Sequence, residues 1–282
     1  MTGITIRNIS KQFGQNKALD QVSLRFGDNK IYGLLGRNGA GKSTLLNILT
    51  NRLFADSGEI TVDGDRVAEN DAALQKLYLM SEKTYYPEKM KMRELFTWTS
   101  RFYPAFDKAL AERIAGQFGL GLDKQVRGLS TGYLSIAKLT VALSVNVPYL
   151  LLDEPVLGLD ANHRELFYRL LLERYIEHPS TIVISTHLIE EVSSVIENVV
   201  ILKSGRIISD ETRDGLLARG YTVSGGAAAV DDYIRDKEVI GVETLAGLKA
   251  AHILGEPQSP EAMGLTISPL DLQKLFIQLT NA

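Results

Sequence analysis

The chain has 282 residues and a formal net charge of −3, from 31 Lys and Arg against 34 Asp and Glu. This length accommodates one large α/β domain and a small addition. The sequence has no cysteine, which excludes disulfide frameworks and thiolate metal sites. Its charge balance provides no broad basic surface, so we expect no nucleic acid partner.

The longest apolar stretches, near residues 139–152 and 199–202, are shorter than the roughly 20 residues that span a bilayer. The N-terminus has no apolar signal region. These features predict a soluble cytoplasmic protein.

The first elements expected along the chain are two half-buried strands. Apolar residues alternate at Ile4 and Ile6, and again at Val22, Leu24 and Phe26, as in antiparallel strands with one solvated face. Strand and helix patterns then alternate through the middle of the chain, which is typical of a mainly parallel sheet flanked by helices. The sequence therefore predicts an α/β fold with a small N-terminal antiparallel β layer.

Residues 36–43, GRNGAGKS, form a complete G-x-x-x-x-G-K-[ST] phosphate-binding loop (P-loop), between an apolar strand at 31–35 and a helical pattern. Its glycines allow backbone N–H groups to face a phosphate, and the helix N-terminus adds a positive dipole. Lys42 is expected to reach the β and γ phosphates, and the Ser43 hydroxyl to bind Mg²⁺. The nucleotide-binding residues expected here are Gly36, Arg37, Asn38, Gly39, Ala40, Gly41, Lys42, Ser43 and Thr44.

A later strand pattern ends in two acids. Residues 149–155 read YLLLDEP, an apolar run that Pro155 prevents from continuing as a central strand. Open α/β sheets bind ligands at the carboxyl ends of their strands. We therefore expect Asp153 to hold the Mg²⁺ shell and Glu154 to orient or deprotonate an attacking water. The alternative is an acidic pair that faces solvent.

The segment 181–186, TIVIST, is another apolar strand pattern, and His187 follows it. This histidine is expected to contact the γ phosphate and to link it to the water and Glu154. A lone histidine after a strand is more often structural, which is the alternative. The order of P-loop, acidic strand and histidine-tipped strand along one chain favours the catalytic role.

Between the P-loop and the acidic strand lies LSTGY, residues 129–133, followed by a helical run. By itself Ser130 is an ordinary helix N-cap. Together with the motifs above, however, the pentapeptide resembles the LSGGQ signature of the ATP-binding subunits of ABC transporters. In that family the signature of one subunit closes over the γ phosphate held by the P-loop of the other. The resemblance implies that Ser130, Thr131 and Gly132 act in trans.

The resemblance extends to two more positions. Phe13 occupies the place of the aromatic residue that stacks on adenine, and the alternative is a strand core residue. Asp160 ends a Gly-Leu-Asp sequence that matches the loop crossing the dimer interface. Both roles are implied by the family and not by the residues alone.

The sequence also departs from the family pattern. Ser81 takes the place of a glutamine that normally touches Mg²⁺ and the water, with Glu82 beside it, and either residue is a candidate for that role. Thr131 and Tyr133 replace a glycine and a glutamine of the signature. These changes predict slow turnover without a change of fold.

Three regions are expected along the chain. The ATPase domain would cover residues 1–215, with a helical subdomain at about 85–145 that carries the signature and receives a membrane partner. Residues 216–282 would form a small C-terminal extension. Within it, Gly225 and Gly226 suggest a flexible turn into a helix, and the sequence Ser-Pro-Leu-Asp at 268–271 suggests the start of a last helix with one apolar stripe.

The resemblance implies a P-loop ATPase that binds ATP and Mg²⁺, forms a homodimer or heterodimer, and drives a separate transmembrane permease from the inner face of the cell membrane. The C-terminal extension favours an exporter. One alternative is a soluble ABC ATPase acting on nucleic acid or ribosomes, but such proteins usually carry two cassettes or a long coiled coil. Another is a regulatory module that binds ATP without hydrolysis; the altered signature favours it and Glu154 argues against it.

Overall fold

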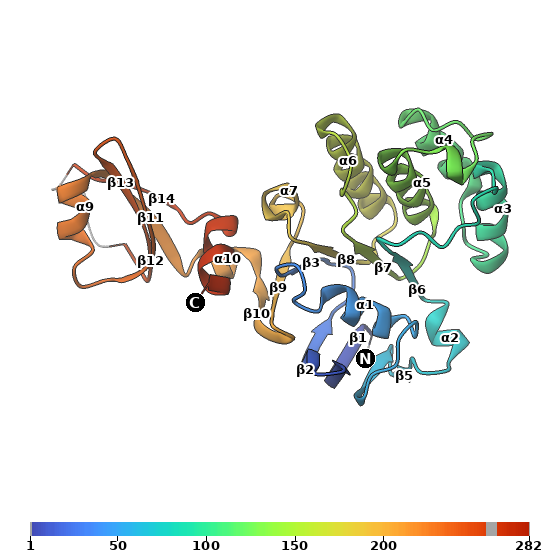
Figure 1. Cartoon of the computed structure of the whole chain (residues 1–282), viewed down its shortest axis with the longest axis horizontal. Coiled ribbons are helices and arrows are strands. Elements are labelled where there is room, and N and C mark those ends of the chain that lie inside the picture. The colour runs from blue at the N-terminus through green and yellow to red at the C-terminus, as the bar shows by residue number, and fades with distance from the viewer. Residues whose placement is uncertain (1, 258–263, 282) are drawn as a thin grey trace.

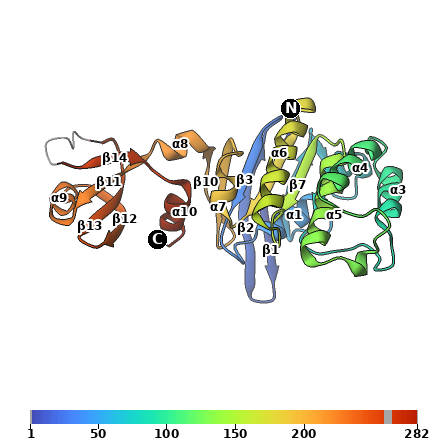
Figure 2. The ribbon, with the colours of Figure 1, turned by 90° about the horizontal axis from the view of Figure 1, so that it is seen from above.

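The computed structural model describes residues 2–257 and 264–281. Figure 1 shows a larger α/β part and, at the left of the view, a smaller C-terminal part. The opposite end of the molecule is formed by the helices α3 (Met92–Phe102), α4 (Lys108–Gln117) and α5 (Thr131–Ser144). Figure 2 shows the same separation from above. Within the described ranges, no helix combines the length and apolar character that a bilayer crossing requires.

The central sheet confirms the expected mainly parallel architecture. Its neighbours β3, β6, β7, β8 and β9 pair in parallel, and only the edge strand β10 is antiparallel. Every residue of β3, β7 and β8 is buried, because helices or a second sheet cover both faces. The six strands lie in the order β10 (Arg206–Thr212), β9 (Asn198–Lys203), β3 (Ile31–Leu35), β8 (Thr181–Thr186), β7 (Tyr149–Asp153) and β6 (Leu77–Met80).

A second, antiparallel sheet confirms the expected N-terminal β layer. A core between the two sheets also takes in the helices α1 (Lys42–Leu49) and α2 (Asp71–Leu74). Leu45, Leu46 and Leu49 of α1 are buried in that core. The strands lie in the order β2 (Asn16–Phe26), β1 (Ile4–Phe13), β4 (Ser57–Val62) and β5 (Asp65–Arg66).

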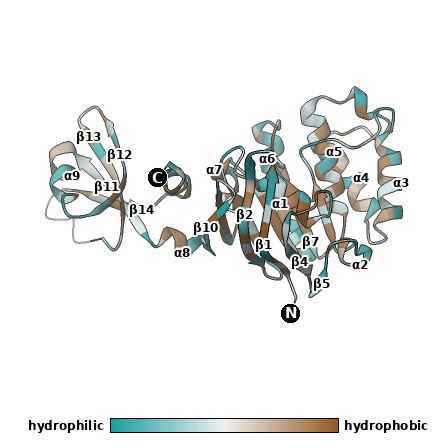
Figure 3. Cartoon of the chain, turned by 60° about the horizontal axis from the view of Figure 1, so that its bottom comes forward, coloured by the Kyte–Doolittle hydropathy of each residue, from teal (hydrophilic) through white to brown (hydrophobic). Residues whose placement is uncertain are grey.

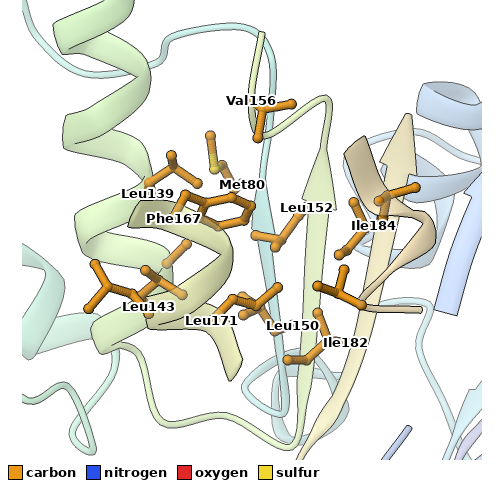
Figure 4. Packing of buried hydrophobic residues seen from close by; sticks show 14 of the residues in the cluster. Met80, Leu139, Leu143, Leu150, Leu152, Val156, Phe167, Leu171, Ile182 and Ile184 are labelled. Carbon is orange, nitrogen blue, oxygen red and sulfur yellow. The ribbon is translucent and has the colours of Figure 1, made fainter. Parts of the chain in front are cut away.

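The larger hydrophobic core lies on the other face of the central sheet. Figure 4 shows Leu139, Leu143, Phe167 and Leu171 packed against Leu150, Leu152, Ile182 and Ile184 of the sheet. The three helices α3 to α5 fall within the range expected for the helical subdomain, whose boundaries remain a prediction. The helices are α3 (Met92–Phe102), α4 (Lys108–Gln117), α5 (Thr131–Ser144), α6 (Ala161–Glu177), α7 (Ile189–Ser193) and α8 (Arg213–Leu217), with a 3₁₀ turn at Val126–Gly128.

The C-terminal part contains a small antiparallel sheet with a core of its own, a helix that packs on this sheet, and a last helix that follows it in the chain. Its strands lie in the order β12 (Glu238–Leu245), β13 (Leu248–Leu254), β11 (Gly220–Gly226) and β14 (Thr266–Pro269). Helix α9 (Ala227–Tyr233) packs on one face of this sheet. The last helix, α10 (Leu272–Asn281), lies between the C-terminal sheet and the larger part (Figure 1).

Helix α10 joins the C-terminal part to the larger part. Its residues Leu272, Leu275 and Phe276 belong to the large core, together with Ile189 and Val192 of α7. The apolar stripe expected in the sequence is thus buried against the large core, whereas the hydropathy colouring of Figure 3 shows both polar and apolar residues on the helix. The C-terminal extension therefore packs on its own chain through α10.

Two local expectations in the C-terminal segment were wrong. A helix does follow the glycine pair, since α9 begins at Ala227, but Gly225 and Gly226 are the last residues of β11, paired with β13, and not a flexible turn. Ser268 and Pro269 belong to β14, so the last helix starts at Leu272. Asp271 serves as its cap, because its Oδ1 accepts the Lys274 N–H at 3.0 Å. Pairing with β11 keeps the 266–269 backbone extended, and local capping signals could not show that pairing.

Candidate nucleotide-binding and catalytic site

The P-loop lies between β3 and α1, and two of its glycines are required by close backbone contacts. Gly41 has a φ of 110°, and a Cβ there would lie 2.4 Å from the Ala18 carbonyl oxygen. At Gly36 a Cβ would lie 2.6 Å from the Leu202 carbonyl oxygen. No larger residue fits at either position without moving the backbone.

The loop borders an open cavity of about 550 Å³. Residues of β1, β2 and the P-loop surround it together with residues that follow β6, β7 and β8, which places the cavity at the carboxyl edge of the parallel sheet. Its lining comprises Phe13, Asn16, Ala18, Asn38, Gly39, Ala40, Gly41, Lys42, Ser43, Thr44, Glu82, Glu154, Leu157 and His187.

Two of the P-loop residues expected to bind nucleotide, Gly36 and Arg37, do not line this cavity. Gly36 lies beneath the loop, where its carbonyl oxygen accepts a hydrogen bond from Lys42 Nζ at 2.8 Å. The Arg37 side chain turns away from the cavity, and its Nη1 donates to Asn281 Oδ1 of α10 at 3.1 Å. The α10 end also accepts a hydrogen bond from Lys203 at the Leu279 carbonyl oxygen. The C-terminal helix therefore contacts the back of the P-loop.

The acid Asp153 is buried at the end of β7. In the parallel pairing of β7 with β8 it lies opposite Ser185, whose hydroxyl donates to its Oδ1 at 2.9 Å. A second hydrogen bond joins it to Ser43. Burial raises the pKa of Asp153, and the two hydrogen bonds oppose that effect. A hydroxyl and a carboxylate side by side are oxygen donors of the kind that Mg²⁺ prefers, so these residues fit the expected ion.

Glu154 lies at the centre of the site. Its Oε1 lies 2.9 Å from His187 Nδ1 and 3.5 Å from Lys42 Nζ. Its Oε2 accepts a hydrogen bond from the Thr186 hydroxyl at 3.0 Å. The backbone of Glu154 has a φ of 49°, which non-glycine residues rarely adopt, and such conformations often occur at functional sites. The contact of Thr186 with Glu154 was not predicted from the sequence. The only sequence signal for it is the position of Thr186 directly before His187.

The structure distinguishes Ser81 from Glu82, the two candidates for the position where the family has a glutamine that touches Mg²⁺. Ser81 lines a different groove, between β6 and α3, and not the nucleotide cavity. Glu82 lines the nucleotide cavity together with Lys42, Ser43 and Glu154. Glu82 is therefore the better placed of the two for an interaction with Mg²⁺ or the water.

Phe13 lies at the end of β1 on the rim of the cavity. Its side chain is 48% exposed, which differs from the burial of a strand core residue. The Lys11 ammonium lies 5.5 Å from the centre of its ring. An exposed aromatic face beside the P-loop is suited to stacking on a nucleotide base.

The signature residues do not line this cavity. Ser130 caps α5 by accepting the Tyr133 N–H at 3.3 Å, and both Ser130 and Thr131 are exposed. Gly132 lies against the loop that follows the acidic strand, and a Cβ there would lie 2.9 Å from the Gly158 carbonyl oxygen. Within one chain, the exposed N-terminus of α5 is thus separate from the P-loop.

Asp160 caps α6, and both of its carboxylate oxygens contact His163. Oδ1 accepts the His163 N–H at 2.9 Å, and Oδ2 lies 3.0 Å from His163 Nδ1. The backbone hydrogen bond is the main cause that lowers the pKa of Asp160. The His163 ring also lies edge-on to Tyr133, so it links the loop at 158–160 to the start of the signature helix.

Comparison with known proteins agrees with this geometry. The ABC transporter family model matches residues 19–157. The chain is 30% identical to the ABC transporter ATP-binding protein YtrB of Bacillus subtilis, over 72% of this chain and 70% of that protein. It is 31% identical to the petrobactin import ATP-binding protein YclP of the same organism, over 73% and 86%. It is 30% identical to the daunorubicin resistance ATP-binding protein DrrA3 of Streptomyces coeruleorubidus, over 85% and 76%.

A solved structure supports the same fold. A dimeric ATP-binding cassette bound to ADP and Pi superimposes with a TM-score of 0.66 at 23% identity, over 74% of this chain and 98% of that one. Together, the fold, the P-loop cavity and these relatives show that the chain belongs to the ATP-binding subunits of ABC transporters. It is an ATPase that uses ATP and Mg²⁺.

Proposed function

We propose that this subunit hydrolyses ATP through Glu154 and powers export by a separate membrane protein. The observation that carries the catalytic assignment is the position of Glu154, which contacts the P-loop lysine, His187 and Thr186 at once. In this arrangement Lys42 neutralises charge on the γ phosphate. Glu154 orients the attacking water and accepts its proton, and His187 and Thr186 keep the carboxylate from rotating. Ser43 and Asp153 would hold Mg²⁺, which would supply positive charge at the phosphate oxygens.

Two subunits, identical or different, complete each site in this proposal. The support is that Ser130 and Thr131 are exposed and lie outside the cavity of their own chain. The N-terminus of α5 offers free N–H groups and a positive dipole to an anion from another molecule. In a head-to-tail dimer, this helix end would close over the ATP held by the partner's P-loop, and the loop with Asp160 would lie at the interface.

The membrane partner is proposed to dock in the groove of about 340 Å³ between β6 and α3. Exposed aromatic side chains border it, including Phe102 at 68% exposure and Trp98 at 46%. Exposed aromatic groups of this kind mark interaction surfaces. Among the described residues that line the groove, Arg52, Lys83 and Lys138 are cations and none is an acid. The groove therefore suits an amphipathic cytoplasmic segment of a permease, and in this proposal the subunit binds that segment at the inner face of the membrane.

Export is favoured over import by the extent of the match. The alignment with the resistance protein DrrA3 spans 246 residues and 85% of this chain, whereas that with the import protein YclP spans 218 residues and 73%. A match over 85% of the chain must extend past residue 215 into the C-terminal part that α10 anchors on the core, whereas a match over 73% need not. Import remains the competing direction for the transport assay.

The test combines purification, cross-linking and transport. The chain has no cysteine, so Phe102→Cys introduces a single thiol at the groove. After affinity purification from native membranes in mild detergent, we expect a polytopic protein to co-purify and to cross-link to this thiol. Ile176→Cys, on an exposed part of α6, is the control that should not cross-link. Absence of a polytopic partner, or equal cross-linking at both positions, would reject the docking site.

Direction is measured with the purified pair in vesicles. ATP added to the side that exposes this subunit should drive substrate away from that side, and Glu154→Gln should abolish the flux. Flux toward the subunit would make it an importer and leave the catalytic assignment intact.

A further inference from the structure

Helix α5 carries a buried lysine that the nucleotide site described above does not include. Lys138 is 6% exposed, and it forms no ion pair among the residues that the structure describes. Its ammonium group instead donates to two consecutive backbone carbonyl oxygens, that of Ser81 at 3.2 Å and that of Glu82. Burial lowers the pKa of Lys138, which reflects the cost of this environment for a cation, and the charge of the Glu82 carboxylate opposes that effect.

A buried cation that forms no salt bridge is a poor choice for stability alone. Two carbonyl oxygens compensate the lost hydration only in part, and an apolar side chain of similar length usually packs as well or better. Its neighbours on α5, from Ile136 to Leu143, are apolar or small apart from Thr140. The charge at this position therefore calls for an explanation other than packing.

The two carbonyl groups that Lys138 holds belong to a segment shared by two cavities. Ser81 and Lys138 line the groove proposed for the membrane partner. The side chain of the next residue, Glu82, lines the nucleotide cavity with Lys42, Ser43 and Glu154. No other described side chain donates to these two carbonyl groups. The backbone beside the Glu82 side chain is thus bonded to the helix that begins with the signature.

We propose that Lys138 is a positioning residue, whose ammonium group holds the carbonyls of Ser81 and Glu82 so that the Glu82 carboxylate faces the bound Mg²⁺ and nucleotide. The proposal rests on the proposed function, because it assigns Glu82 to that site. It predicts that Lys138 acts on Mg²⁺ use through Glu82 and has little effect on nucleotide binding in the absence of the ion.

The first test is Lys138→Met in the full chain, which removes the charge and keeps the length. We expect the concentration of Mg²⁺ needed for half-maximal ATP hydrolysis to rise about tenfold, as is typical when a residue that orients a metal ligand is lost. The ATP affinity measured by calorimetry in EDTA should stay unchanged, while the enhancement of that affinity by Mg²⁺ should shrink. The melting temperature should stay the same or rise, because a buried unpaired cation has been removed.

Two further variants serve as the control for Lys138→Met and as a partial rescue of its effect. Lys108→Met makes the same charge change on the exposed start of α4 and should alter none of these quantities. Lys138→Arg retains donors for the two carbonyl oxygens and should recover part of the Mg²⁺ response. A lower melting temperature with an unchanged Mg²⁺ response in Lys138→Met would show a structural lysine and overturn the proposal.

The decisive comparison is a double-mutant cycle with Glu82→Gln. If Lys138 acts through Glu82, the double variant should be no worse in its Mg²⁺ response than Glu82→Gln alone. Additive losses, or an effect of Lys138→Met with none from Glu82→Gln, would reject the route through Glu82. Failure of the proposed function itself would be distinct, since the parent chain would then show no Mg²⁺-dependent ATP hydrolysis that Glu154→Gln removes.

Discussion

Glu154 Oε1 lies 2.9 Å from His187 Nδ1 and 3.5 Å from Lys42 Nζ, so one carboxylate oxygen connects the P-loop lysine to the histidine at the tip of β8. These residues come from three separate segments that the parallel pairing of β3, β7 and β8 brings to one edge of the sheet. The same contacts determine what each substitution should do.

Glu154→Gln should keep ATP binding and stop turnover, because the amide fills the same space and cannot accept the proton of the water. In the presence of ATP and Mg²⁺ the variant should accumulate as a dimer, which size-exclusion chromatography detects. A monomeric elution profile, or hydrolysis at the parent rate, would remove Glu154 from this role.

Lys42→Ala should weaken nucleotide binding. The substitution removes a charge-assisted phosphate contact worth roughly 1.5 to 3 kcal/mol, which corresponds to about a tenfold to a hundredfold loss of affinity. Isothermal titration calorimetry with ATP measures the change, and circular dichroism checks that the fold is retained. An unchanged dissociation constant would contradict the assignment of Lys42 as a phosphate ligand.

Ser130→Ala distinguishes a helix cap from a residue that acts in trans. If the hydroxyl only accepts the Tyr133 N–H, the variant should lose about 1 kcal/mol of stability and keep its ATPase activity per folded molecule. If Ser130 closes the partner's site, activity should collapse while ATP binding by the monomer stays normal. A fully active Ser130→Ala homodimer would reject the trans role.

Mixing two inactive variants tests the head-to-tail dimer itself. A chain with Lys42→Ala paired with a chain carrying Ser130→Ala would place both lesions in one composite site and leave the other site intact. Partial recovery of ATPase activity is therefore expected. If heterodimers form without any recovery, then either both residues act within one chain or the two sites cannot fire independently.

Phe276→Ala should destabilise the whole chain and not only the C-terminal part. Phe276 is 6% exposed and belongs to the large core beneath α10, so truncation should cost about 3 kcal/mol in the free energy of unfolding. Ile277→Ala, its 41% exposed neighbour on the same helix, should cost less than about 0.5 kcal/mol. Urea denaturation followed by fluorescence measures both; equal costs would mean that α10 does not dock as described.

Asp63 should contribute to acid sensitivity. Burial alone would raise its pKa, but hydrogen bonds from Tyr149, Lys76 and the Gly3 N–H outweigh that effect and lower it below 3.8. A carboxylate whose pKa is lower in the folded state than in the unfolded state stabilises the fold at pH values above its unfolded-state pKa. This contribution is lost as the pH falls through the folded-state pKa.

Asp63→Asn should therefore be less stable than the parent at neutral pH, and the difference should shrink as the pH falls below about 4. Urea midpoints across this range provide the measurement. Asp65→Asn, at an exposed neighbouring acid, should leave the slope with pH unchanged. A difference between Asp63→Asn and the parent that stays constant with pH would contradict the role of the Asp63 charge.

The sequence by itself determined the fold class, the P-loop and the positions of the acidic and histidine-tipped strands. These features are local: the P-loop needs eight consecutive residues, and a strand that is buried on both faces appears as a continuous apolar run. Local signals failed where pairing is distant in sequence. The cap pattern at 268–271 gave way to the pairing of β14 with β11, which lies more than forty residues earlier.

Only the tertiary structure decided which side chains meet. Ser81 and Glu82 are adjacent in sequence, yet they line different cavities, because β6 ends at Met80 and the chain bends at Glu82. The bonds from Lys138 to that segment join residues 56 and 57 positions apart, and the Thr186 contact to Glu154 spans 32. Neither a periodicity nor a motif in the sequence predicts contacts between residues so far apart. These contacts form when helix α5 and strand β8 pack beside the segments that they contact.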